Sequence, residues 1–138
     1  MLNHLYKYEI DKSVLSSFIF DNDEFFKNEF TDSMFSENRI VIFTAIKEII
    51  NSGNEADIVT ITNKLTGVIK ASEIMEISDS PVSPNLKYHL SELEKARLRR
   101  EMASAYTVAL EMCKTGSDPS EIDLVVKGKI SNIEIFEP

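Results

Sequence analysis

A run of 31 residues from Asn85 to Thr115 contains neither glycine nor proline. Such a run predicts one long helix, about 45 Å in length at about 1.5 Å per residue. Gly116 follows it, and the sequence Asp-Pro-Ser-Glu at 118–121 is typical of a helix start, with Asp as N-cap and Pro at the first helical position. The loop between the two helices is too short for anything but an antiparallel return. Residues 86–136 are therefore predicted to form a helical hairpin.

The predicted hairpin carries apolar side chains along most of its length, as far as Phe136. Much of one face has no cover from the same chain, and exposed apolar surface of that extent usually marks an interface. A second copy of the hairpin is the simplest cover and would give a two-fold contact. Some of the candidate residues must instead hold the two helices of one hairpin together, and the pattern does not divide the two sets. The candidate pairing residues are Leu98, Met102, Tyr106, Ile122, Val126, Ile130 and Ile133.

Residues 10–84 predict a compact bundle of short helices, which we call the head. The segment 10–21 is predicted to be a helix with Asp11 as its N-cap, and 23–30 a shorter one. Another short helix is expected at 71–77. With residues 85–136 as the hairpin, residues 1–138 are predicted to form one all-α domain. The aromatic side chains expected to point inward from the second helix are Phe25, Phe26 and Phe30.

Two further helices with a tight turn between them are predicted within 37–65. Ser36 is a suitable N-cap for the first helix, whose apolar residues recur every three or four positions. Gly53 follows its last periodic residue, where a left-handed C-cap favours glycine. Asp57 is the N-cap expected for the second helix. A helix–turn–helix of this kind superficially suggests a DNA reader, but its second helix offers few side chains that could read base edges.

The composition agrees with an all-α chain. Only four Gly and four Pro occur among 138 residues, and the hydrophobic fraction of 43% is enough for an ordinary core. The sequence contains no apolar run of about eighteen residues that could span a membrane, and its N-terminus lacks the pattern of a secretion signal. The cytoplasm is therefore the expected compartment. The single cysteine, Cys113, excludes a disulfide framework within the chain and is expected to be a small buried hydrophobe.

Charge argues against a stand-alone DNA-binding function. The formal net charge is −8, whereas nucleic-acid binding draws most of its affinity from Lys and Arg. The segment from Asp21 to Glu37 contains six acidic residues and only one lysine. This excess of negative charge fits a solvated surface or, less commonly, a docking face for a basic partner. One basic run is interleaved with glutamates, so it fits intrahelical ion pairs, with partner docking as the alternative. This run consists of Lys95, Arg97, Arg99 and Arg100.

The sequence carries no recognisable catalytic site. A phosphate-binding loop needs Gly-x-x-x-x-Gly-Lys followed by Ser or Thr, and no glycine of this chain precedes such a sequence. The Gly-Lys pair at 128–129 lies within a predicted helix and lacks the upstream glycine. His4 and His89 have no metal-ligand spacing with each other or with Cys113. We therefore expect no catalytic residues, no bound cofactor and no metal ion in this chain.

The chain also carries packing motifs in a distinctive order. They are Ser13-Val14-Leu15 with Asp21, Phe35, the run 43–46, Gly53, the run 57–61, the run 73–77, Tyr88 and the run 96–100. Together they resemble the N-terminal domain of bacterial replicative hexameric helicases, the DnaB family, over residues 10–136. The chain departs from that pattern at three places. Ser16 replaces a glycine, Arg39-Ile40 occupies the position of His-Arg, and Glu73 replaces a tyrosine.

In that family the domain is not the motor. It forms a collar of paired hairpins above a hexameric ATPase ring, and it contacts primase and loader proteins. The resemblance therefore implies a non-catalytic chain that assembles with itself, as a dimer or as a hexamer built from three dimers. It also implies primase or a helicase loader as a partner in DNA replication, with weak or absent DNA contact and no membrane contact. ATP and Mg²⁺ are expected only in a motor domain beyond a linker.

Two alternatives remain open at this point. The chain ends at Pro138, where the family's linker would begin. It is therefore either part of a longer helicase or a short natural protein, such as a phage-type adaptor or inhibitor that imitates the collar. The other alternative is a helical DNA-binding domain, which weak and strongly salt-dependent DNA binding would favour.

Overall fold

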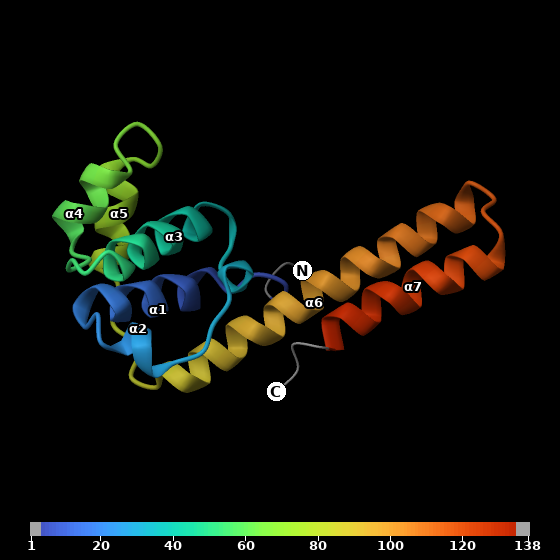
Figure 1. The fold of residues 1–138 in the computed structure, drawn as a ribbon, viewed down its shortest axis with the longest axis horizontal. Coiled ribbons are helices and arrows are strands. Elements are labelled where there is room, and N and C mark those ends of the chain that lie inside the picture. The colour runs from blue at the N-terminus through green and yellow to red at the C-terminus, as the bar shows by residue number, and fades with distance from the viewer. Residues whose placement is uncertain (1–3, 135–138) are drawn as a thin grey trace. The chain divides into compact units, whose positions relative to one another are not determined.

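The structure is a computed structural model that describes residues 4–134, with side chains described for 4–133. Over this range every regular element is helical, which confirms the predicted all-α class (Figure 1). The chain divides into two compact units between Ala96 and Arg97, inside one long helix. The elements are α1 (Tyr8–Phe20), α2 (Glu24–Lys27), the 3-10 turn η2 (Asp32–Met34), α3 (Glu37–Asn51), α4 (Ile58–Lys64), α5 (Ala71–Ser78), α6 (Leu86–Lys114) and α7 (Pro119–Glu134).

The first unit is a bundle around one apolar core. Helix α1 packs against α2, α3 and α5, while α4 packs against α3 and α5. The first three turns of α6 belong to this unit, because their leucines join its core. Each helix therefore buries the apolar stripe that its periodicity predicts. The most deeply buried members of the core include Val14, Leu15, Phe18, Phe35, Phe43, Ile46, Ile61, Ile74, Ile77 and Leu93.

Aromatic rings link the short α2 to the rest of the bundle. The ring of Phe35 stacks on that of Phe43 with centroids 4.5 Å apart, and Phe25 lies 4.9 Å from Phe30. Such offset and edge contacts add to the area that the rings bury. The prediction that Phe26 also points inward is wrong, since 67% of its surface is exposed. Helix α2 spans only Glu24–Lys27, and one turn of helix cannot turn two adjacent rings to the same side.

The boundaries of the α3–α4 pair are those that the sequence predicts. Gly53 has φ +88°, and its amide donates to the carbonyl of Ile50 while the next amide donates to Ile49, which together close a left-handed cap. The carboxylate of Asp57 accepts the amide of Thr60 at 2.8 Å and so caps α4. Ser36 occupies the N-cap position of α3 as expected, but its hydroxyl makes no cap hydrogen bond.

Asp11 has a different role from the predicted one. Helix α1 begins at Tyr8, so Asp11 lies in its first turn and is not the N-cap. Only 1% of its surface is exposed, and its carboxylate accepts hydrogen bonds from the hydroxyl of Ser36 at 2.5 Å and from the amide of Ser36 at 3.3 Å. A carboxylate at the start of α3 also suits that helix's dipole. Asp11 therefore ties α1 to α3 across the interior of the first unit.

Candidate assembly and docking surfaces

The second unit is a helical hairpin built from the last part of α6 and from α7, which run side by side in opposite directions (Figure 1). Gly116, with φ +80°, forms the turn, and the next amide donates to the carbonyl of Met112 at 3.0 Å. The carboxylate of Asp118 accepts the amide and the hydroxyl of Ser120 and caps α7. These hydrogen bonds lower the pKa of Asp118, with the backbone amide of Ser120 as the larger cause. The two predicted antiparallel helices are present as far as Glu134, but the part of α6 up to Ala96, which was predicted to belong to the hairpin, lies in the first unit. The predicted Phe136 lies outside the described residues.

One side of α6 presents apolar side chains to solvent. Met102, Tyr106 and Leu110 are 41%, 54% and 54% exposed, and Cys113 is exposed as well. Their spacing of four, four and three residues puts them on one side of the helix, over about 16 Å at about 1.5 Å per residue. We call Met102, Tyr106, Leu110 and Cys113 the α6 stripe. Because it faces water within the described chain, it is the surface of this unit that is best placed to contact another molecule.

The structure places the other predicted pairing residues differently. Leu98, Ile122, Val126 and Ile130 are half-buried, and Ile133 is buried at 8% exposure. The four residues from α7 share one side of that helix at three-to-four-residue spacing. They therefore fit the seam inside one hairpin, whereas Met102 and Tyr106 fit an outer surface.

Sequence reasoning missed Leu110 and misjudged Cys113. Leu110 stands four residues after Tyr106, so continuing the same spacing would have found it. Cys113 was expected to be buried, and this prediction is wrong because the residue is exposed. It lies three residues before Gly116 at the turn, and its apolar character alone could not decide its burial.

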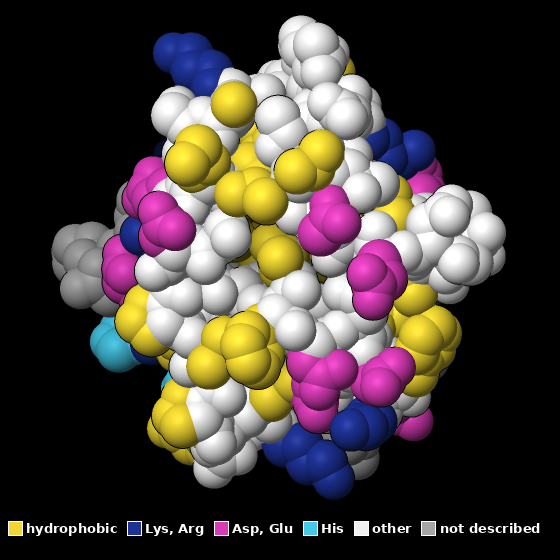
Figure 2. Space-filling model, turned by 90° about the vertical axis from the view of Figure 1, so that its left-hand side faces the viewer, with side chains coloured by type: hydrophobic (Ala, Val, Ile, Leu, Met, Phe, Trp, Pro, Cys, Tyr) yellow, Lys and Arg dark blue, Asp and Glu magenta, His cyan; other side chains and the backbone are white. Residues whose placement is uncertain are grey.

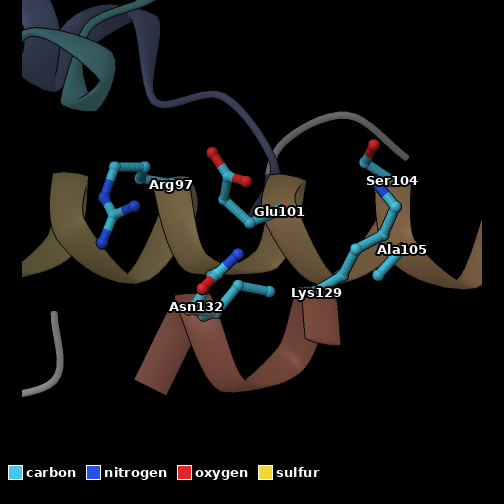
Figure 3. A pocket seen from close by; sticks show the side chains of 7 residues that line it. Arg97, Glu101, Ser104, Ala105, Lys129 and Asn132 are labelled. Carbon is cyan, nitrogen blue, oxygen red and sulfur yellow. The ribbon is translucent and has the colours of Figure 1, made fainter. Parts of the chain in front are cut away.

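A cavity of about 210 Å³ lies between the two helices of the hairpin (Figure 3). Arg97 and Lys129 bring positive charge to it and Glu101 brings negative charge, so its lining is close to balanced. Figure 3 shows the labelled side chains of both helices around the cavity, with Arg97 towards one end and Ser104 and Lys129 towards the other. Its lining consists of Arg97, Glu101, Ser104, Ala105, Lys129, Asn132 and Ile133.

The four residues of the predicted basic docking run differ in how far their side chains are exposed to solvent. Lys95 and Arg99 are exposed, Arg100 is half-buried, and Arg97 is buried with 5% of its surface exposed. Lys95 lies 4.0 Å from Glu92 one turn earlier, an exposed ion pair of the kind that stabilises a helix only slightly. Within this predicted run, the exposed side chains are therefore those of Lys95 and Arg99.

Within residues 4–133 no three His, Cys, Asp or Glu side chains come together in a way that could hold a metal ion. Lys127 beside the Gly-Lys pair forms an ion pair with Asp123 at 2.8 Å, and this hydrogen bond raises the pKa of Lys127. Gly128 and Lys129 themselves lie within α7, so they belong to a helix and not to a phosphate loop. None of the described helices has the length and apolar character needed to cross a membrane.

Comparisons with known proteins agree with this geometry. The family model for the DnaB-like helicase N terminal domain matches residues 3–95, which cover the first unit almost completely. A search of curated proteins found no match. Among solved structures, the N-terminal domain of DnaB helicase from Mycobacterium tuberculosis matches with a TM-score of 0.81 at 18% identity, covering 93% of this chain and 99% of that one. At this identity the structural match shows the shared fold, hairpin included, while the family match covers more than half of the sequence. The chain belongs to the DnaB-like helicase N-terminal domain family.

Proposed function

We propose that this chain is the collar domain of a replicative DNA helicase and that its work is assembly. The observation that carries the proposal is the α6 stripe, an exposed apolar surface on the hairpin of a DnaB-like N-terminal domain. Pairing of two stripes around a two-fold axis would remove both from water at once. Three such dimers would then build a six-membered collar.

The collar has no catalytic role in this proposal. ATP, Mg²⁺ and the strand-separating chemistry belong to a motor domain, and the collar sets the number and spacing of the subunits. The head and the outer side of the collar remain available for primase or a helicase loader. Lys95 and Arg99 are exposed on α6 and are candidates for such a contact. Protein partners rather than DNA suit a chain with a net charge of −8.

Sedimentation equilibrium over a wide concentration range tests the pairing. The natural chain is expected to sediment as a dimer, or as dimers that assemble towards six copies. Tyr106→Glu and Met102→Glu should each shift it to monomer, because an unpaired charge buried at an interface weakens association by at least about a hundredfold. Both variants should keep the helical circular dichroism of the natural chain, since both positions are exposed.

Val68→Glu provides the control. It adds the same charge at a position with 66% exposure that belongs to the first unit and not to the stripe, and it should leave the assembly unchanged. A natural chain that stays monomeric at every concentration would contradict the proposal. Equal dissociation by Val68→Glu would show that added negative charge, not the stripe, controls association. Calorimetric titration of the assembled chain with a bacterial primase would then test partner docking.

A further inference from the structure

A shallow groove of about 290 Å³ lies in the first unit where α1 ends and where the chain approaches α4. Phe20, the last residue of α1, stands in its lining with 81% of its surface exposed, the largest exposed fraction among the bulky hydrophobic side chains described. Ile19 and Ala56 supply the rest of its apolar lining. An aromatic ring left so far in water has no structural task within the described unit. The acidic residues that line the groove are Asp21, Asp23, Glu55 and Asp57.

The two loops that form the groove are held together by one side chain. The amide of Asn22 donates to the carbonyl of Phe18 at 2.7 Å and to the carbonyl of Ala56 at 3.1 Å. Its carbonyl oxygen accepts the backbone amide of Ala56 at 2.8 Å. These hydrogen bonds join segments 34 residues apart in the sequence. The groove is therefore a fixed feature of the first unit and not a chance approach of two surface loops.

The charge around the groove is not neutralised by the chain itself. Elsewhere in the first unit carboxylates have lysine partners, such as Asp32 with Lys47 at 3.2 Å and Glu48 with Lys64 at 3.0 Å. None of the four groove carboxylates lies within ion-pair distance of a Lys or Arg in the described part of the chain. Figure 2 looks onto this end of the first unit and shows acidic side chains beside exposed hydrophobic ones. Carboxylates that line one groove and have no ion-pair partner there attract a cationic partner.

The arrangement discriminates between kinds of cation. No three acidic side chains in the described residues converge closely enough to hold a metal ion, so the groove carboxylates are spaced for separate positive groups. A second copy of this chain is a poor source of such groups. Its most basic run, 95–100, is flanked by Glu92, Glu94 and Glu101, so the cations of that run already have carboxylate neighbours on the same helix. The cations must therefore come from a different protein.

We propose that this groove docks an arginine-bearing segment of a partner protein. The planar guanidinium of Arg can bond a carboxylate through two hydrogen bonds and can also lie over the ring of Phe20. Lysine offers a compact charge without that flat surface. The inference rests on the proposed function, since it names the chemistry of one docking surface on the collar domain. It assigns that surface to the head, and the basic run on α6 is not part of it.

Fluorescence anisotropy with two labelled peptides tests the proposal. The probes are a peptide of alternating Arg and Ala and its counterpart of alternating Lys and Ala, each titrated with the full chain at low salt. The Arg peptide should bind about two- to fivefold more tightly than the Lys peptide. Phe20→Ala should abolish that difference. Because Phe20 is 81% exposed, this variant should fold normally.

A charge-matched pair of triple variants separates the groove from overall acidity. Asp21→Asn, Asp23→Asn and Glu55→Gln together remove three groove charges and leave the Asp57 cap intact. They should weaken the Arg peptide by at least about fivefold. Glu29→Gln, Glu111→Gln and Glu121→Gln together remove three exposed charges elsewhere and should change binding by less than about twofold.

Two results would overturn the proposal. Equal weakening by both triple variants would mean that the peptide responds only to the net charge of the chain. Equal binding of the Arg and Lys peptides to the natural chain would remove the role of the Phe20 ring. Neither result depends on hairpin pairing, because the peptides bind the first unit. A chain that sediments as a monomer would thus contradict the collar assembly and leave the groove result standing.

Discussion

The buried Asp11 connects α1 to the start of α3 in the first unit. Its buried carboxylate accepts the hydroxyl and the amide of Ser36, which is itself 2% exposed. Asp11→Ala would leave both Ser36 donors buried without this acceptor, so we expect a loss of about 1–3 kcal/mol in the free energy of unfolding. Urea denaturation followed by circular dichroism measures it. Glu9→Ala on the same helix is the control, because the Glu9 side chain is 87% exposed and should cost much less. Similar losses from both would contradict the account.

Asp57 is expected to make the stability of the chain depend on pH. The backbone amide of Thr60, followed by its hydroxyl, lowers the pKa of Asp57 below the ordinary value of 3.8. A pKa that is lower in the folded state means that the charged form stabilises folding. This contribution is complete above the pKa of the unfolded chain and is lost as the pH falls through the lowered value.

Because the charged form of Asp57 stabilises folding, we predict that replacing Asp57 destabilises the chain more at neutral pH than at acidic pH. Asp57→Ala should lower the unfolding midpoint at neutral pH, where the natural carboxylate caps α4, and should lower it less at pH values below the folded pKa. Thermal unfolding of both chains at each pH measures the difference. A gap between the two midpoints that stays constant from neutral to strongly acidic pH would argue against the carboxylate cap.

At the scale of elements, the hairpin contains two glycines at which substitution by alanine should have opposite effects on stability. Gly116 has φ +80° at the turn, a conformation that strains any residue with a Cβ, so Gly116→Ala should cost about 1 kcal/mol. Gly128 lies inside α7, and a Cβ built there meets nothing within 4 Å. Gly128→Ala should therefore stabilise the chain by up to about 1 kcal/mol.

The two alanine variants form a matched pair, since the same atoms are added in both. Chemical denaturation should move the midpoint in opposite directions for them. A destabilising Gly128→Ala would mean that this position needs its glycine for close approach of another molecule, such as the second hairpin of a dimer.

At the scale of the whole molecule, Cys113 reports on assembly without any substitution. It is exposed in the single chain and lies on the α6 stripe. If two stripes pair, the thiol should become protected. We expect a maleimide to react at least about tenfold more slowly at concentrations where the chain is dimeric than where it is monomeric. Tyr106→Glu should restore fast reaction at every concentration, and reaction rates that ignore concentration would place the interface elsewhere.

How much of the fold could be predicted depends on how far apart in the sequence the interacting residues are. Gly53, Asp57, Gly116 and Asp118 mark helix ends through hydrogen bonds that span two to five positions of the sequence, so the sequence reveals them directly. Asp is a residue type that often caps helices, but Ser36, the hydrogen-bond partner of Asp11, is 25 residues away in the sequence. Phe26 has the same local pattern as Phe25 and yet faces water. Such choices depend on which other elements come near.

The same division applies to the candidate surfaces. The α6 stripe was half predicted, since Met102 and Tyr106 were named but could not be separated from the half-buried residues of α7. The groove beside Phe20 could not be predicted at all, because Asn22 joins two loops that are 34 residues apart in the sequence. The acidity of residues 21–37 hinted at a docking face, but Glu55 and Asp57 come from the second loop.

By itself the sequence determined the helical class, the order of the helices, most of their ends and the family pattern, because periodicity and capping act within a few residues of the chain. Only the tertiary structure decided which apolar side chains are left in water, which carboxylate is buried and which acidic loops meet. Those properties arise when segments distant in the sequence compete for the same space, and no local pattern contains the outcome of that competition.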